Sequence, residues 1–136
     1  EDAPVVVATD CDERAVTITA DNVTIKGFVL DNDSESEGCD SYEPVVSIGQ
    51  TDPEAEDQDI NDATVSDNEI RNGTKGVDLS PQSSENTITN NLIHDNDKNS
   101  EDNNNEGVWI GGSTDNTISD NEIYGNSTGI GLGQDE

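Results

Sequence analysis

The sequence predicts an all-β fold, a right-handed single-stranded parallel β-helix of about four to five coils with polar loop insertions. The frame T-[VI]-[ST]-[DN]-N-x-I recurs three times, at 64–70, 87–93 and 117–123, with a degenerate copy at 24–30. A second frame, two aliphatic residues around one other residue, occurs at 16–18, 46–48, 77–79, 108–110 and 130–132. Internal repeats of this length are typical of stacked architectures, and no stretch has apolar residues at helical spacing over three turns.

The distances between equivalent positions give the length of one coil. From Val65 to Ile88 is 23 residues and from Ile110 to Leu132 is 22, whereas from Ile88 to Ile118 is 30. The basic coil therefore has 22 or 23 residues, and extra residues enter at particular corners. We expect a single domain, 1–136, with repeats at about 14–48, 60–83, 84–113 and 114–136 and insertions at 31–44, 50–62 and 94–107.

The short frames are strands. The apolar and polar residues of Val77-Asp78-Leu79 alternate with a period of two, which is the pattern of a half-buried strand, and Val, Ile and Thr favour strands. Each strand is too short to bury its apolar face alone. Stacking the coils solves this, because each coil covers the next and extends one core.

One asparagine of the repeat is expected to form a column along the coils. Asn68, Asn91 and Asn121 occupy the same position in the frame, with Phe28 at the start of the column. Asn tolerates left-handed backbone at a turn, and stacked amides can bond from coil to coil. Asn96 falls in the insertion 94–107, so we expect it in a loop, where its side chain contributes little to stability.

These motifs resemble the parallel β-helix repeats of the pectate-lyase-like and NosD-like superfamily. The best matches are 86–88 with Asn91 and 116–118 with Asn121, and Gly-Val or Gly-Ile pairs at 76–77, 107–108 and 129–130 supply the second half of the repeat. The resemblance covers roughly residues 14–133, and the acidic composition is similar to that of haloarchaeal members.

The resemblance also implies how the strands are arranged. It identifies 77–79 and its equivalents as the first strand of each coil, 87–89 as the second, and the stretch ending at Ile93 as the third. Ile88, Ile93, Val108 and Ile110 would then point inward, and Thr87, Thr89 and Trp109 outward. Because the superfamily contains lyases, hydrolases, adhesins and inert surface modules, the resemblance leaves the function open.

Composition limits the environment and the partners. Only 28% of residues are hydrophobic, and 32 Asp and Glu against 5 Lys and Arg give a formal charge of −27. Such a chain would be disordered without its regular repeat. Salt screens the self-repulsion, so we expect a secreted or cell-surface protein of a salt-loving organism. A binding site for nucleic acid is excluded for want of a basic patch, and no apolar run is long enough for membrane insertion.

The outer column of the first strands suggests a carbohydrate site. By alternation Trp109 faces solvent beside Asp78, where an aromatic ring and carboxylates would suit a sugar; the alternative is that a loop or a neighbouring subunit covers it. His94 and Arg71 are further candidates. We find no catalytic pattern and assign no catalytic residue; an enzyme, which is the less favoured reading, would be a polysaccharide lyase or glycoside hydrolase.

Two acidic segments are candidate Ca²⁺ sites, and Ca²⁺ is the only cofactor we expect. The segment 95–106 has oxygen ligands at positions 1, 3, 5 and 12 of an EF-hand-like loop, but position 6 is Ser100 instead of Gly and no helices flank it. The alternative is a solvated acidic surface. The candidate ligands are Asp95, Asp97, Asn99 and Glu106 in one segment and Asp31, Asp33 and Glu35 in the other.

Cysteines and sequons give weaker indications. Cys11 and Cys39 lie around the first coil and are candidates for a disulfide, which would close a loop and stabilise the chain by about 3–4 kcal/mol. Four N-x-S/T sequons are candidate glycosylation sites. They lie at Asn22, Asn32, Asn72 and Asn126.

The ends of the repeat suggest the leading function. Strand signals at 5–7 and 130–132 run close to both termini without a capping segment, so either the chain is a piece of a longer helix or coil ends meet in a homo-oligomer or filament. The sequence therefore favours a non-catalytic structural or adhesive module that self-associates end to end in high salt. The alternative is a carbohydrate-binding or polysaccharide-cleaving domain around Trp109.

Overall fold

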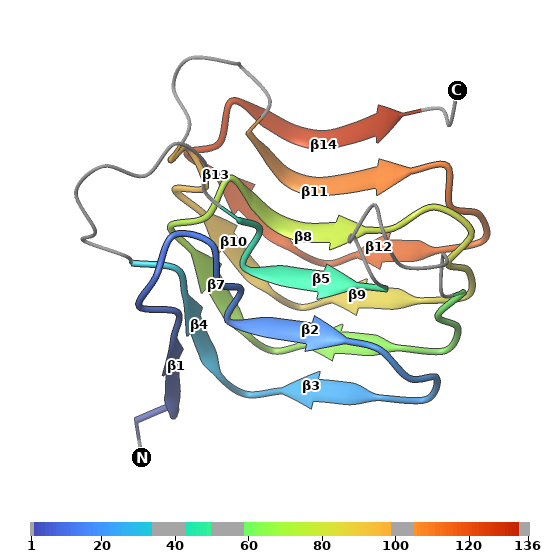
Figure 1. Ribbon diagram of the computed structural model, residues 1–136, viewed down its shortest axis with the longest axis horizontal. Coiled ribbons are helices and arrows are strands. Elements are labelled where there is room, and N and C mark those ends of the chain that lie inside the picture. Colours follow the sequence, from blue (N-terminus) through green and yellow to red (C-terminus); the bar gives the residue numbers. More distant parts are fainter. Residues whose placement is uncertain (1, 34–42, 50–58, 99–104, 134–136) are drawn as a thin grey trace.

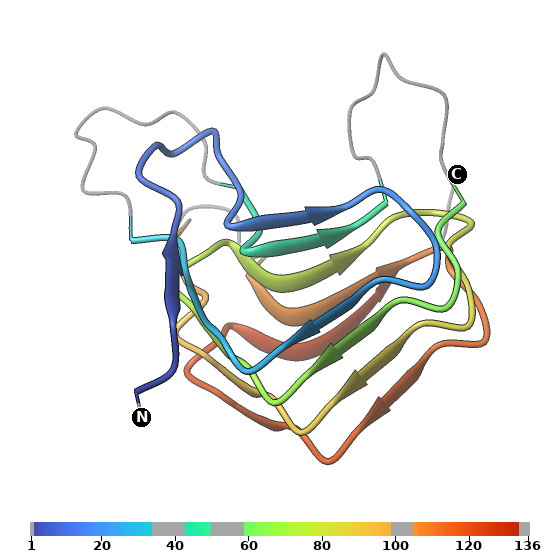
Figure 2. The same cartoon turned by 90° about the horizontal axis from the view of Figure 1, so that it is seen from below.

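The computed structural model describes residues 2–33, 43–49, 59–98 and 105–133, and in these residues it contains fourteen strands and no helix (Figure 1). The strands are short, mostly of three residues, and succeed one another around a common interior, so that the chain winds into stacked coils (Figures 1 and 2). All strand pairs are parallel. The predicted fold class, an all-β parallel β-helix, is confirmed.

Three sheets run along the stack, and each complete coil contributes one strand to each of them. The first sheet contains β2 (Val16–Ile18), β5 (Val46–Ile48), β8 (Lys75–Leu79), β11 (Glu106–Gly111) and β14 (Thr128–Gly133). The second contains β3 (Thr24–Lys26), β6 (Thr64–Ser66), β9 (Thr87–Thr89) and β12 (Thr117–Ser119). The third contains β1 (Val5–Val7), β4 (Val29–Asp31), β7 (Glu69–Arg71), β10 (Leu92–His94) and β13 (Glu122–Tyr124).

The strand register places equivalent residues of the repeat directly above one another. In the first sheet Ser47 pairs with Asp78, Asp78 with Trp109, and Trp109 with Gly131. In the second sheet Ile88 pairs with its counterparts on both neighbouring strands. The insertions therefore leave the strands in register and enter only at the corners between them.

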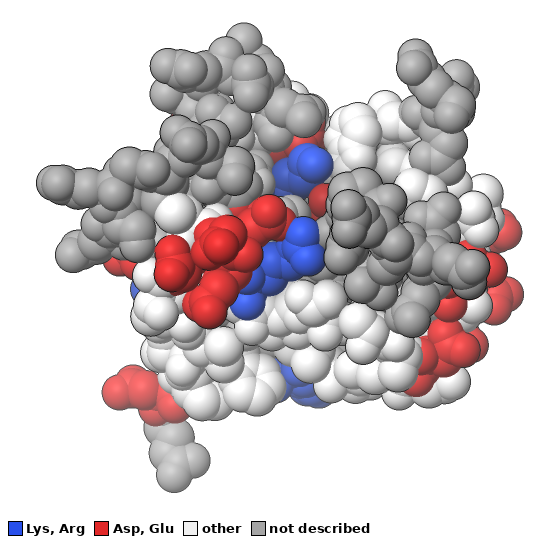
Figure 3. Space-filling model, viewed as in Figure 1, with Lys and Arg blue, Asp and Glu red and all other residues white. Residues whose placement is uncertain are grey.

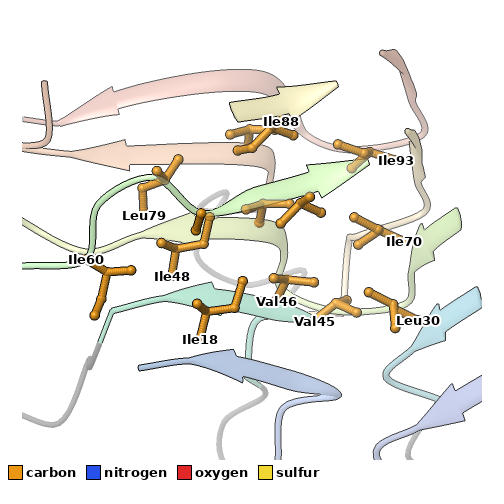
Figure 4. Packing of buried hydrophobic residues seen from close by; sticks show 14 residues of the cluster. Ile18, Leu30, Val45, Val46, Ile48, Ile60, Ile70, Leu79, Ile88 and Ile93 are labelled. Carbon is orange, nitrogen blue, oxygen red and sulfur yellow. The ribbon is translucent and has the colours of Figure 1, made fainter. Parts of the chain in front are cut away.

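The core consists of aliphatic columns, one for each inward position (Figure 4). Ile48 pairs with Leu79 in the first sheet and Ile70 with Ile93 in the third, and all four side chains are fully buried. Because each inward side chain packs on its counterpart one coil away, a few aliphatic residues per coil suffice for a continuous core. This explains how a chain with 28% hydrophobic residues folds.

The asparagine column lies at the corner between the second and third sheets. The backbone N–H of Asn68 donates to Oδ1 of Asn91 at 3.0 Å, and the N–H of Asn91 donates to Oδ1 of Asn121 at 2.9 Å. At the start of the column, the N–H of Phe28 donates to Asn68 Oδ1. Each side-chain amide also donates to a carbonyl of the preceding coil, as Asn91 does to Val65 O at 2.9 Å. The amides thus satisfy backbone groups that the turn would otherwise leave unpaired.

Asn96 does not lie in an exposed loop, and that expectation was wrong. It is fully buried, its Oδ1 accepts the N–H of Gly73 at 3.0 Å, and its N–H donates to Asn126 Oδ1. A further pair, Asn86 and Asn116, repeats the pattern at another corner. Every corner of the coil therefore carries its own asparagine ladder, and the insertion after β10 begins beyond Asn96.

Several expectations concern residues that the structure does not describe. The segments 34–42, 50–58 and 99–104 fall within the three predicted insertions, so the candidate ligands Glu35 and Asn99 and the cysteine Cys39 lie outside the described residues.

Candidate functional site

The outer face of the first sheet brings four chemically distinctive side chains together, a group called here the first-sheet cluster. Its members are Lys75, Asp78, Glu106 and Trp109, from the neighbouring strands β8 and β11. Glu106 pairs in register with Lys75, and Trp109 with Asp78. The ammonium of Lys75 lies 3.6 Å from Asp78 Oδ2 and 5.4 Å from the centroid of the Trp109 ring.

Trp109 lies against the next strand, β14, over its glycines. A Cβ at Gly131 would lie 2.7 Å from Trp109 Cε3 and 2.8 Å from Cγ of Glu106, so only glycine leaves room for both side chains there. A Cβ at Gly133 would also collide with the indole ring. The glycine backbone of β14 and the Lys75 ammonium both lie against the indole ring of Trp109, so the ring is half-buried. It is therefore less available for sugar stacking than the sequence suggested.

The two carboxylates of the cluster are buried although they point outward. Asp78 is 8% exposed and Glu106 is 4% exposed. Loss of solvent raises the pKa of the Asp78 carboxyl above its ordinary value, an effect that the nearby Lys75 partly offsets. Burial likewise raises the pKa of Glu106, and its Oε2 has no hydrogen-bond partner among the described residues. The cluster thus combines two desolvated carboxyl groups with the Lys75 ammonium, which is paired with Asp78.

His94 and Arg71, the other two carbohydrate candidates, lie on the third sheet and not in this cluster. They pair in register on β10 and β7 and belong to a chain of contacts called here the third-sheet ladder. Arg71 bonds Asp31 at 2.7 Å and Glu69 at 2.7 Å, and the pKa of Arg71 is raised, chiefly by its hydrogen bond to Asp31. The structure therefore separates the four candidates into two pairs on different sheets.

His94 is the centre of this ladder. Its Nε2 lies 3.1 Å from Glu69 Oε1, and its Nδ1 lies 2.7 Å from Asp95 Oδ2. Its ring stacks on that of Tyr124, with centroids 5.0 Å apart. Only 8% of His94 is exposed, so its ring is held from three sides.

The candidate Ca²⁺ ligands are engaged in different places. Asp97 accepts hydrogen bonds from Asn105 and Ser127, whereas Glu106 belongs to the first-sheet cluster and Asp31 to the third-sheet ladder. Asp33 lies 3.5 Å from the ammonium of Lys98. Among the described residues no group of three or more His, Cys, Asp or Glu side chains is arranged to hold a metal ion.

The remaining candidates are placed as follows. Cys11 is disulfide-bonded. Of the sequon asparagines, Asn22 is exposed at a corner with φ of 60°, whereas Asn32 is 1% exposed and donates to Glu43 O. The side-chain amides of Asn72 and Asn126 also donate hydrogen bonds within the protein. Asn22 is the sequon most accessible to modification.

The surface charge is distributed unevenly. In the view of Figure 3, one group of Asp and Glu side chains lies directly beside Lys and Arg side chains near the middle of the face, and another lies at the right margin. The basic side chains are largely committed to ion pairs, such as Arg14 with Glu43 and Lys26 with Asp67. All five Lys and Arg side chains lie beside a carboxylate.

Comparison with known proteins agrees with the coil architecture. The family model described as "Periplasmic copper-binding protein (NosD)" matches residues 54–136, which is more than half of the chain. The chain belongs to the NosD family. No curated protein and no solved structure shows significant similarity to it. The expected resemblance to NosD-like parallel β-helices is thus confirmed.

Membership in the NosD family also bears on location and on metals. The family is described as periplasmic, in agreement with the expected secreted or cell-surface location. Within the described ranges no helix is long and apolar enough to cross a membrane. The family description names copper instead of Ca²⁺, but the residues present do not fit a Cu(I) site, because the sequence has no Met, one His and two Cys, of which Cys11 is disulfide-bonded.

Proposed function

We propose that this NosD-family chain is a non-catalytic, exported structural module that associates end to end and is adapted to high salt. The observation that carries the proposal is the exposure of inward-column residues on β14. Ile130 is 46% exposed and Leu132 is 77% exposed, whereas Val77 and Leu79, two coils away in the same columns, are fully buried. Apolar side chains of this kind are normally covered by the next coil.

The polarity of the sheets suits head-to-tail contact between copies. Each sheet has one edge strand at either end of the stack: β2, β3 and β1 at one end, and β14, β12 and β13 at the other. Since all pairing is parallel, β14 of one copy can pair with β2 of the next, and β13 with β1. The second sheet has four strands against five in the others, so this joint would continue the first and third sheets and leave a gap in the second. Such a contact is heterologous and open-ended.

Salt supports the same proposal. With a formal charge of −27, two copies repel each other in dilute buffer. Screening shortens the range of that repulsion from roughly 10 Å at 0.1 M salt to about 3 Å at 1 M. We therefore expect association to increase with salt, whereas contacts made by ion pairs would weaken.

The test is sedimentation of the chain at several concentrations in low and molar salt. We expect assemblies larger than a dimer in molar salt, and Leu132→Ser should reduce them. Thr87→Ser is the control, because Thr87 is half-buried on β9, in the interior of the second sheet, which the joint does not continue. A chain that stays monomeric in molar salt, or equal effects of both variants, would contradict the proposal.

Carbohydrate binding at the first-sheet cluster is the second candidate function. It is favoured by one observation, an indole beside two buried carboxyls of raised pKa, which in their protonated form can donate hydrogen bonds to sugar hydroxyls. Affinity electrophoresis in gels that contain neutral or acidic polysaccharides tests it. Retardation that Trp109→Ala abolishes and Tyr124→Ala preserves would support this candidate, and unretarded migration in every gel would remove it.

A further inference from the structure

The copper named in the family description requires particular donors. Cu(I) sites in proteins are built from thiolate, thioether and imidazole groups, whereas Cu(II) takes square-planar nitrogen and oxygen donors. Carboxylates alone suit Mg²⁺, Ca²⁺ and Mn²⁺ instead. A chain that holds Cu(I) should therefore bring at least two soft donors together.

This chain has very few such donors. Its 136 residues contain no Met, one His and two Cys, so no thioether is available anywhere in the sequence. Cys11 is disulfide-bonded and therefore has no thiolate to offer. Throughout the described residues no group of three or more His, Cys, Asp or Glu is arranged around a metal position.

The single imidazole is already occupied at both nitrogens. A histidine ligates a metal through the lone pair of a neutral ring nitrogen. Here Nε2 is 3.1 Å from Glu69 and Nδ1 is 2.7 Å from Asp95, while Tyr124 covers a face of the ring. Both nitrogens face carboxylates, so each is a hydrogen-bond partner within the protein instead of an open coordination site.

The contacts of His94 point to another role. Asp31, Arg71, His94 and Tyr124 come from β4, β7, β10 and β13, which are consecutive strands of the third sheet. Asp31 bonds Arg71, Arg71 and His94 share Glu69, and His94 stacks on Tyr124. The ladder thus links four coils on the outside of the sheet, opposite the aliphatic column.

We infer that this member of the NosD family holds no Cu(I) and that His94 acts instead as a structural clamp between coils. Glu69 and Asp95 contact the two nitrogens at the edge of the imidazole ring, and Tyr124 stacks on its face. The inference goes beyond the proposed structural function, because it assigns a role to a residue that end-to-end association does not use.

The experiment combines a copper titration with thermal unfolding of the full chain. Cu(I) is titrated without oxygen in the presence of a chromogenic chelator of micromolar affinity, for the unmodified chain and for His94→Gln. We expect the chelator to keep all the Cu(I) in both cases. His94→Gln should lower the melting temperature by roughly 2–6 °C, the range for loss of about one contact's free energy in a domain of this size. Glu122→Gln, exposed on β13, is the control and should lower it by less than about 1 °C.

Each outcome decides one part of the inference. One equivalent of Cu(I) taken from the chelator by the unmodified chain would overturn the absence of copper, the more so if His94→Gln loses it. No copper uptake together with an unchanged melting temperature of His94→Gln would overturn the structural clamp. No uptake and a lowered melting temperature support both parts.

Discussion

Replacing Asn91 by alanine should destabilise the fold by about 2–6 kcal/mol. Asn91 is 2% exposed, and its side chain satisfies two buried backbone groups of the preceding coil, the N–H of Asn68 at 3.0 Å and the carbonyl of Val65 at 2.9 Å. Alanine leaves both without a partner, and each buried orphan costs about 1–3 kcal/mol. The neighbouring amides are less affected, because Asn68 Nδ2 keeps Ile25 O and Asn121 Oδ1 keeps the N–H of Asn91.

Three further variants separate the ladder from a general effect of mutation. Asn96→Ala should cost a similar free energy, because Asn96 satisfies the N–H of Gly73 and the carbonyl of Ile70 in the same way. Asn91→Asp keeps the acceptor but replaces the donor to Val65 O with a second oxygen, so it should also destabilise the fold. Glu122→Ala, at an exposed outward position on β13, should change stability by less than about 0.5 kcal/mol.

The measurement is urea unfolding in constant molar salt, followed by circular dichroism at a wavelength that reports strands. If Asn91→Ala loses less than about 1 kcal/mol while the slope with urea is unchanged, buried amide bonds do not hold the corners, and the reasoning from orphaned backbone groups is wrong. A large effect of Asn91→Ala with a negligible effect of Asn96→Ala would show that the ladder between the third and first sheets is not formed.

Three other outcomes are expected. The folded-state pKa values of Asp78 and Glu106 are raised, so the stability that these groups contribute is present below their unfolded-state pKa values and is lost as pH rises through the raised values. Glu106→Gln should therefore unfold at a higher temperature than the unmodified chain near pH 7, with no difference below about pH 4. A lower melting temperature of this variant at pH 7 would contradict the reasoning. Gly133→Ala should lower the melting temperature and shift the Trp fluorescence, because its Cβ would meet the Trp109 ring. Gly129→Ala is the control and should do neither, because no atom of the described residues, apart from its chain neighbours, lies within 4 Å of its Cβ position. Identical spectra of the two variants would refute the described position of Trp109. The melting temperature of the unmodified chain should rise from low to molar salt, and equal values would refute the role of screening.

The repeat made the fold predictable, because it shows both where each strand lies and which of its side chains point inward. The frame around Ile88 and the frame around Leu79 each set an inward residue, and a parallel stack follows when every coil has the same spacing. The column of Asn68, Asn91 and Asn121 could be found because it belongs to the repeated frame. Pairing between strands far apart in the sequence is usually the hardest feature to infer from a single sequence. Here it follows from the local repeat, because equivalent positions of successive repeats pair with each other.

The role of Asn96 was missed because its frame is interrupted. Its counterpart Asn126 follows the same strand position, so the spacing N-x-x-x-x-N from Asn91 to Asn96 and from Asn121 to Asn126 was a usable signal. The acidic residues around Asn96 suggested a loop, and the polar composition hid a residue that is fully buried. Composition therefore misleads at positions where a polar side chain is needed inside.

The candidate site was less predictable than the fold, because the alternation of apolar and polar residues shows which side of a sheet a side chain lies on but not how deeply it is buried. Trp109 and Asp78 are neighbours on the outer face as expected, yet Asp78 is 8% exposed. His94 was assigned to the neighbourhood of Trp109 from its place in the sequence, but it ends β10 and belongs to another sheet. Packing of side chains over a strand depends on residues from other coils, which the pattern of a single coil does not contain.

Part of the acidity has a conformational cause. Asp62, Asp115 and Asp120 are exposed corner residues with φ of 58°, 55° and 55°, in the left-handed region that Asp and Asn tolerate and Ala does not. Replacing all three by Asn changes the formal charge from −27 to −24 and keeps the corners, so the triple variant should need less salt to fold. Replacing all three by Ala removes the same charge but costs about 1–2 kcal/mol at each corner. Melting curves in low and molar salt separate the two causes. If the Asn and Ala variants melt alike at both salt concentrations, these corners do not need a residue that tolerates positive φ, and the aspartates contribute only charge.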